Sequence, residues 1–132
     1  MYIWSGDLID RIQLIYTLRD GSIFEGKRYG GGGGRRQVFQ LADNEYITGI
    51  SGRHGEVIDS IKIHTNRRTS DTYGGRGGAR NFNITIPNGK QAIGLTGRAG
   101  EYLDAIGLEY IRSRESVQEN PRRRQDRYRN WR

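Results

Sequence analysis

Polar and hydrophobic positions alternate along most of this chain. Apolar side chains recur at every second position in three separate segments: Ile12, Leu14, Tyr16 and Leu18; Ile61 and Ile63; Ile106, Leu108 and Tyr110. A period of two residues with β-branched and aromatic side chains is typical of strands that bury one face. No stretch before residue 112 has the spacing of an amphipathic helix. The pattern therefore predicts an all-β body.

A Gly-x-x-x-Asp motif stands at the start of each alternating segment. Residues 50–61 match residues 95–106: Ile-Ser-Gly-Arg-His-Gly-Glu-Val-Ile-Asp-Ser-Ile against Leu-Thr-Gly-Arg-Ala-Gly-Glu-Tyr-Leu-Asp-Ala-Ile. A third copy, Gly-Asp-Leu-Ile-Asp-Arg-Ile, occupies residues 6–12. An internal repeat of this kind indicates a body made of equivalent structural units.

Glycine-rich runs form a second repeated element. Tyr29 precedes glycines 30–34, and Tyr73 precedes the Gly-Gly-Arg-Gly-Gly run 74–78. Each run leads into an alternating segment and then into the next motif. Turn residues at 19–21, 43–44 and 87–89 bound further strands. Each unit supplies about four short strands, which predicts a threefold arrangement.

Composition agrees with strands joined by many turns. The chain has 132 residues, the length of one domain, with 20 Gly and only 33% hydrophobic residues. It has no Cys, which excludes disulfides, iron–sulfur clusters, Cys-based zinc sites and thiol catalysis. No apolar run approaches the roughly 20 residues of a membrane helix. The first residues lack the pattern of a signal peptide, so cytoplasmic location and non-classical secretion both stay open.

The positive charge is concentrated at one end. Residues 113–132 contain seven Arg and three acidic residues, which leaves 15 Lys and Arg against 12 Asp and Glu in residues 1–112. We expect a folded domain over 1–112 and a basic Arg-rich tail over 113–132, disordered or forming a short helix.

The motif loops are suited to a neutral ligand with several hydroxyl groups. Glycine lets the backbone turn and exposes amide donors, and the motif aspartate offers two acceptor oxygens beside them. The glycine runs lack the Lys-Ser/Thr of a phosphate-binding loop, and a carboxylate repels phosphate. They also lack the aspartates of calcium-binding glycine repeats.

The Gly-x-x-x-Asp loops, the Tyr-Gly-Gly-x-Gly-Gly runs and the ending Tyr-Leu-Asp-Ala-Ile-Gly resemble jacalin-related lectins, most closely the mannose-binding, griffithsin-like branch. The resemblance covers residues 2–111. It implies a β-prism I fold of three Greek-key sheets with pseudo-threefold symmetry. It also implies metal-independent, multivalent, non-enzymatic binding of mannose- or glucose-type glycans, with high-mannose glycoproteins as partners.

The resemblance assigns roles to individual residues. The last motif residue accepts sugar hydroxyls O4 and O6, the second and third positions donate backbone amides, and the last glycine of the facing run donates to O3. The carried-over positions are Asp10 with Asp7, Leu8 and Gly34; Asp59 with Glu56, Val57 and Gly78; and Asp104 with Glu101 and Tyr102.

The third site departs from the family pattern. The Gly-Gly loop and strand with which family members begin have no counterpart ahead of residue 2, so we expect the Asp104 site to lack its glycine wall unless another subunit supplies it. The third sheet is short of a strand for the same reason. Insertion of the tail, or domain swapping in a homo-oligomer, would supply it.

Other interpretations stay open at this point. The aspartates would also serve as turn caps that accept neighbouring amides. The paired motif acids suggest a glycosidase only if their carboxylates converge, and no catalytic role is expected. His54 is expected in a solvated loop and His64 on a solvent face, so no metal site or cofactor is predicted. One alternative function is a module that binds nucleic acid or an anionic surface through the tail, although nucleic acid is the less expected partner. The other is a domain that binds no sugar and serves in assembly.

Overall fold

The computed structural model describes residues 1–17, 20–111 and 128–130. Within these ranges every regular element is a β-strand, as the alternating pattern predicts. The same ranges contain no helix with the length and apolar character needed to span a membrane.

The first two sheets have the same topology. Sheet one contains β1 (Tyr2–Ser5), β2 (Ile9–Thr17), β3 (Ile23–Gly30) and β4 (Arg35–Val38) in the order β3-β2-β1-β4. Sheet two contains β5 (Ile47–His54), β6 (Ile58–Thr65), β7 (Tyr73–Gly74) and β8 (Arg80–Thr85) in the order β7-β6-β5-β8. All neighbouring strands are antiparallel. This order, in which the fourth strand returns beside the first, is a Greek key.

Sheet three takes a strand from the basic tail. It contains β9 (Gln91–Ala99), β10 (Leu103–Ile111) and β11 (Tyr128–Asn130) in the order β11-β10-β9. β11 pairs with β10 in the position that β3 has beside β2 and β7 has beside β6. The prediction of a disordered or helical tail is therefore wrong for Tyr128–Asn130, and tail insertion supplies a strand to the short sheet. The rest of the predicted tail lies outside the described residues.

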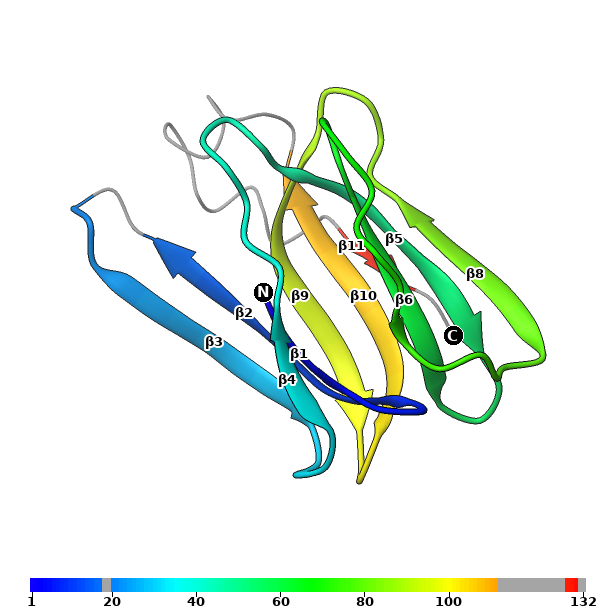
Figure 1. Cartoon of the computed structure of the whole chain (residues 1–132). Helices are drawn as coiled ribbons and strands as arrows, with labels where there is room; N and C mark the ends of the chain where they lie inside the picture. The colour runs from blue at the N-terminus through cyan, green and yellow to red at the C-terminus, as the bar shows by residue number, and fades with distance from the viewer. Residues whose placement is uncertain (18–19, 112–127, 131–132) are drawn as a thin grey trace.

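The three sheets enclose one core (Figure 1). Its centre is made of residues at equivalent positions of the three units, each at most 1% exposed. One set is Ile9, Ile58 and Leu103, and the other is Ile12, Ile61 and Ile106. The equivalence of these buried residues confirms the pseudo-threefold body, a β-prism.

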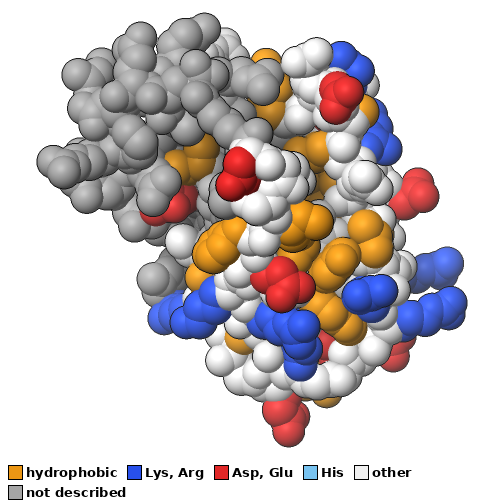
Figure 2. Space-filling model, turned by 90° about the vertical axis from the view of Figure 1, so that its left-hand side faces the viewer, with side chains coloured by type: hydrophobic (Ala, Val, Ile, Leu, Met, Phe, Trp, Pro, Cys, Tyr) orange, Lys and Arg blue, Asp and Glu red, His pale blue; other side chains and the backbone are white. Residues whose placement is uncertain are grey.

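Sheet one exposes apolar side chains on its outer strands. Ile23 and Phe24 of β3 and Val38 of β4 are 70%, 53% and 53% exposed. Figure 2, which views the molecule from the side of β3 and β2, shows hydrophobic side chains lying among Lys and Arg side chains.

Of the two histidines, His54 differs from expectation, whereas His64 lies on the face of β6 opposite to the buried Ile61 and Ile63. His54 is buried rather than solvated, since the alternation of β5 continues through it on the same face as the buried Ile50, and its ring packs 6.1 Å from that of Phe82. His64 is half-buried between the hydroxyls of Ser51 (2.6 Å) and Thr69 (3.0 Å). Burial, and then the charge of Lys62, lower the pKa of His64. Both side chains have structural roles.

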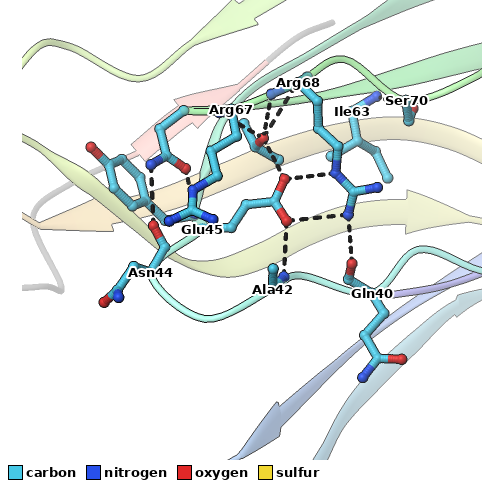
Figure 3. A network of polar contacts seen from close by, with 11 residues as sticks. Gln40, Ala42, Asn44, Glu45, Ile63, Arg67, Arg68 and Ser70 are labelled. Carbon is cyan, nitrogen blue, oxygen red and sulfur yellow. Dashed lines mark hydrogen bonds and ion pairs between the residues drawn. The ribbon is translucent and has the colours of Figure 1, made fainter.

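A polar network ties two connecting segments together far from the motif loops (Figure 3). The buried carboxylate of Glu45 accepts from Arg68 Nε (2.8 Å), from the Ala42 amide (2.9 Å) and from the Thr65 hydroxyl (2.7 Å). Arg68 also donates to the Gln40 carbonyl and lies 4.6 Å from the centre of the Phe39 ring. The network fastens the chain before β5 to the chain after β6.

The same network predicts acid sensitivity. The hydrogen bonds from Arg68, and then those from Ala42 and Thr65, lower the pKa of Glu45 from 4.5 to about 2. A depressed carboxyl pKa adds stability that is present above pH 4.5 and is lost as pH falls towards 2. Thermal melts should therefore show Glu45→Gln with a lower Tm than the parent at pH 7, and the gap should close between pH 4.5 and 2. A Tm gap that does not change with pH would contradict this role.

Candidate functional site

The three motif loops lie at the same end of the prism (Figure 1) and close with the same hydrogen bond. The first glycine of each motif donates its amide to the carbonyl two residues later. These bonds are Gly6 to Leu8 (3.1 Å), Gly55 to Val57 (3.0 Å) and Gly100 to Tyr102 (3.1 Å). The amides of the second and third residues of each loop take no part in these bonds. Those six amides make no hydrogen bond within the described part of the chain.

Each motif aspartate is the extra residue of a β-bulge. Ser5 pairs with Ile9 and Trp4 with Arg11, which leaves Asp10 without a partner across the ladder. Asp59 and Asp104 are skipped in the same way between β5 and β6 and between β9 and β10. Bulges re-aim a side chain at functional sites. The bulge is why these carboxylates turn towards the loops and not into the core.

The sequence contained a signal for these bulges. Ile9 and Ile12 are three residues apart, and both are fully buried. In a regular strand, residues three apart face opposite sides, so one extra residue must lie between them. The pairs Ile58 with Ile61 and Leu103 with Ile106 repeat this spacing.

The glycine-rich runs form a wall against two of the aspartates. A methyl group on Gly34 would lie 2.5 Å from Asp10 Oδ2, and one on Gly33 would lie 2.9 Å from Asp10 Oδ1. In the second unit a methyl group on Gly77 would lie 2.9 Å from Asp59 Oδ2. The predicted pairing of aspartates with glycine runs is therefore present in space. Gly33 and Gly77, which the sequence reasoning did not single out, face the carboxylates, and Gly78 lies against the amide of His54.

Backbone geometry repeats between the two walls. The Gly31 amide donates to the Asp10 carbonyl and the Gly75 amide to the Asp59 carbonyl, both at 3.0 Å. The first and last glycines of each run have positive φ, at 132° and 77° in the first run and 98° and 95° in the second. Only glycine adopts these angles at little cost.

Arginine side chains fix the glycine runs in place. Arg11 Nε donates to the Gly31 carbonyl at 2.6 Å. Arg53 donates to the Gly78 carbonyl from Nε (3.1 Å) and Nη2 (2.7 Å), and from Nη1 to Asn81. These contacts are not predictable from the repeat, because Arg11 and Arg53 come from strands that are not equivalent in their units.

Asp10 and Asp59 are recessed, and their carboxylates have no hydrogen-bond partner in the described part of the chain. Both are 8% exposed, and neither carboxylate accepts a hydrogen bond from the described residues. Burial raises the pKa of Asp10. Among the described residues Gln13 Oε1 is the one buried polar side-chain atom that lacks a hydrogen-bond partner, so the oxygens of Asp10 and Asp59 are not sealed from solvent and can be reached by a ligand. A turn-capping aspartate would have amide donors, so the capping interpretation does not fit the described contacts.

The third loop is different. Asp104 is exposed, and a methyl group on Gly100 would meet nothing within 4 Å. No glycine run of the described residues faces Asp104. Tyr102, at the third motif position, is 37% exposed, whereas Leu8 and Val57 are half-buried.

The acids at the second motif position do not share the setting of the aspartates. Asp7, Glu56 and Glu101 are exposed at the loop tips, whereas Asp10 and Asp59 are recessed beside glycine.

Neighbouring loops also touch. Gly31 packs against the Glu101 backbone, and Gly75 packs against the Asp7 backbone. A hollow of about 390 Å³ beside the first loop is lined by Ser5, Gly6, Arg35, Gln37, Thr72 and Gly74.

Comparison with known proteins decides the family. The model of the jacalin-like lectin domain matches residues 1–109. The chain belongs to the jacalin-like lectin family. A lectin domain of this family binds carbohydrate and is not an enzyme, which agrees with the sequence prediction.

Relatives of this lectin domain are found among plant proteins. It is 36% identical over 75 residues to Jacalin-related lectin 5 of Arabidopsis thaliana, a match covering 53% of this chain and 10% of the relative. It is 34% identical over 80 residues to Horcolin of Hordeum vulgare, a match covering 56% of this chain and 55% of the relative. The matches thus span 10% and 55% of the length of these relatives.

Solved structures share its fold. Malaysian banana lectin is 31% identical with a TM-score of 0.73, covering 85% of this chain and 81% of that one. Calystegia sepium agglutinin is 30% identical with a TM-score of 0.75, covering 85% of this chain and 80% of that one. Artocarpin, solved as a complex with Me-alpha-mannose, is 28% identical with a TM-score of 0.72, covering 83% and 79%. The predicted β-prism of a jacalin-related lectin is confirmed.

Proposed function

We propose that this lectin domain binds mannose-type glycans at two equivalent sites built on Asp10 and Asp59. One observation supports the proposal above the others. In both places a recessed carboxylate with no protein donor lies beside unpaired backbone amides and a wall of glycine. A pyranose with adjacent hydroxyls satisfies both kinds of group at once, since each hydroxyl donates and accepts.

The sugar in each site is held by the bulged carboxylate, the loop amides and the glycine wall. In the first site two hydroxyls donate to Asp10 and accept from the amides of Asp7 and Leu8, and a third accepts from Gly34. In the second site Asp59, Glu56, Val57 and Gly78 take these roles. Metal-independent binding is part of this proposal. The described residues contain no group of three His, Cys, Asp or Glu side chains that would hold one.

Mannobiose and longer chains extend beyond the first sugar. The hollow beside the first loop offers polar side chains from Ser5, Arg35, Gln37 and Thr72 to a second ring. A few hydrogen bonds worth about 0.5–1.5 kcal/mol each give millimolar affinity for one sugar. Two sites on one glycan then raise the affinity roughly 10²–10⁴-fold. High-mannose glycans are the expected partners, and homo-oligomerisation stays a prediction.

Titration calorimetry tests this function. Mannobiose should bind with weak affinity, and a branched high-mannose glycan should bind far more tightly. Galactose at the same concentration serves as the control and should give no heat. If no mannoside gave a heat of binding, a domain that serves in assembly without binding sugar would be favoured instead.

Binding at the first site should depend on pH. Sugar hydroxyls donate to the ionised carboxylate, and burial raises the pKa of Asp10. Protonation therefore removes the acceptor at a pH above that of an ordinary aspartate. In an Asp59→Asn background, which isolates the first site, mannobiose affinity should fall as pH drops through the raised pKa of Asp10. Affinity that does not change down to the ordinary range of aspartate would contradict the role of Asp10.

A further inference from the structure

The outer face of sheet one combines arginines with aromatic rings. Tyr2 and Trp4 flank the fully buried Ile3 on β1, so their side chains point outward, where both are half-buried. The guanidinium of Arg11 lies 5.1 Å and that of Arg28 lies 5.6 Å from the centre of the Trp4 ring. A third, that of Arg36, lies 4.8 Å from the Tyr2 ring. The two rings meet edge to face at 5.9 Å.

These five residues, the arginine–aromatic face, span the whole sheet. Arg28 lies on β3, Arg11 on β2 and Arg36 on β4, with the two rings on β1 between them. Strands are spaced about 4.8 Å apart, so the outermost strands, β3 and β4, lie roughly 14 Å apart.

The three guanidinium groups have no carboxylate partner among the described residues. The one ion pair within these ranges joins Arg68 to Glu45 and involves none of the three arginines. Arg11 uses only Nε, towards Gly31, and the side chains of Arg28 and Arg36 make no hydrogen bond to the described residues.

Sheet one carries few acidic groups. Its four strands contain Arg11, Lys27, Arg28, Arg35 and Arg36 but only two carboxylates. Asp10 faces the glycine wall, and Glu25 pairs with Ile15, beyond the Gln13–Arg28 pair. The face is thus an unneutralised positive surface.

Ring stacking orients an arginine while leaving most of its N–H donors free. A guanidinium held in this way presents a planar fork that matches sulfate and carboxylate oxygens. Nucleic-acid surfaces use aromatic rings differently, because bases stack on open ring faces. Here arginines already occupy Trp4 and Tyr2, which favours a polyanion without bases.

We propose that the arginine–aromatic face binds sulfated polysaccharide. It is a second carbohydrate surface, with chemistry opposite to that of the Asp10 and Asp59 sites. Those sites use carboxylates to bind neutral hydroxyls, whereas this face uses arginines to bind fixed anions. It does not depend on the mannose sites being occupied.

Heparin is the probe for this surface, used with the full chain. The test variant is Arg28→Gln with Arg36→Gln, and the matched control is Arg67→Gln with Arg80→Gln, which removes the same charge from exposed arginines outside sheet one. The basic tail is present in both, so its contribution cancels. The test variant should bind heparin about tenfold more weakly at low salt, from the loss of charge-assisted hydrogen bonds. The control variant and mannan binding should stay near the parent.

A second readout follows Trp4 directly. The chain has two tryptophans, and a Trp131→Phe background leaves Trp4 as the only one. Heparin should shift the Trp4 emission, with the same midpoint as binding. Equal weakening of both arginine variants would overturn the proposal in favour of general charge attraction. No weakening in either, or tighter binding of a single-stranded oligonucleotide than of heparin at matched salt, would also overturn it.

Discussion

Replacing both recessed aspartates, as Asp10→Asn with Asp59→Asn, should abolish binding to mannan and to high-mannose glycans. Each aspartate is 8% exposed as a residue and its carboxylate makes no hydrogen bond to the described residues, so its acceptor capacity is available to a ligand. An amide replaces one acceptor oxygen with a donor. The loss of charge-assisted hydrogen bonds costs about 1.5–3 kcal/mol at each site, or roughly 10–100-fold in affinity. Loss of both sites also removes avidity, so surface-bound mannan should retain no measurable lectin.

The control for this experiment is Asp104→Asn. It changes the same motif position, but Asp104 is exposed and faces no glycine wall in the described structure, so the effect on mannan binding should be small. Thermal stability separates a binding role from a turn-capping role. Because burial raises the pKa of Asp10, the folded state disfavours its ionised form, and a neutral side chain should leave Tm at pH 7 equal or higher. Lowered Tm with retained sugar binding would make Asp10 a structural cap.

The second large effect is expected from Gly34→Ala. The residue has φ of 77°, and its new methyl group would lie 2.5 Å from Asp10 Oδ2 and 2.8 Å from the Ser5 amide nitrogen. A left-handed alanine costs about 1–2 kcal/mol, and the clash displaces the carboxylate as well. Calorimetry should therefore show the stoichiometry falling by one mannobiose per chain, with the Asp59 site still active.

Gly89→Ala provides the matched comparison. Gly89 has nearly the same φ, 78°, but an added methyl group meets nothing within 4 Å. The left-handed alanine should lower the Tm by an amount similar to that caused by the backbone strain in Gly34→Ala. The number of mannobiose molecules bound per chain should not change. If both variants kept full stoichiometry, the glycine wall would have no part in binding.

Much of this architecture was predictable because it is repeated. The Gly-x-x-x-Asp loops and the glycine runs recur in the same order, which predicts equivalent units, and the resemblance to jacalin-related lectins then pairs Asp10 with Gly34. The turn at 87–89 was also predictable from its residues, and it closes through a hydrogen bond from Lys90 to Pro87. Local chemistry and repetition were sufficient for these features.

Features that depend on contacts between distant strands were not predictable. The brace from Arg11 to Gly31 requires the pairing of β2 with β3, and β11 requires residues 128–130 to return to β10. His54 was misjudged because its position before a glycine suggested a loop, whereas strand alternation places it inside. The ring contacts of Arg28 and Arg36 depend on neighbouring strands in the same way.

The central claim is that a bulged aspartate, free amides and a glycine wall together form a sugar site, and that the chain has two of them. A crystal structure of the chain with mannobiose tests it most directly. The predicted result is one sugar against Asp10 and one against Asp59, with hydroxyls within hydrogen-bond distance of both carboxylates and of the amides of residues 7–8 and 56–57. Saturating mannobiose bound elsewhere, with Asp10 and Asp59 contacted only by water, would contradict it.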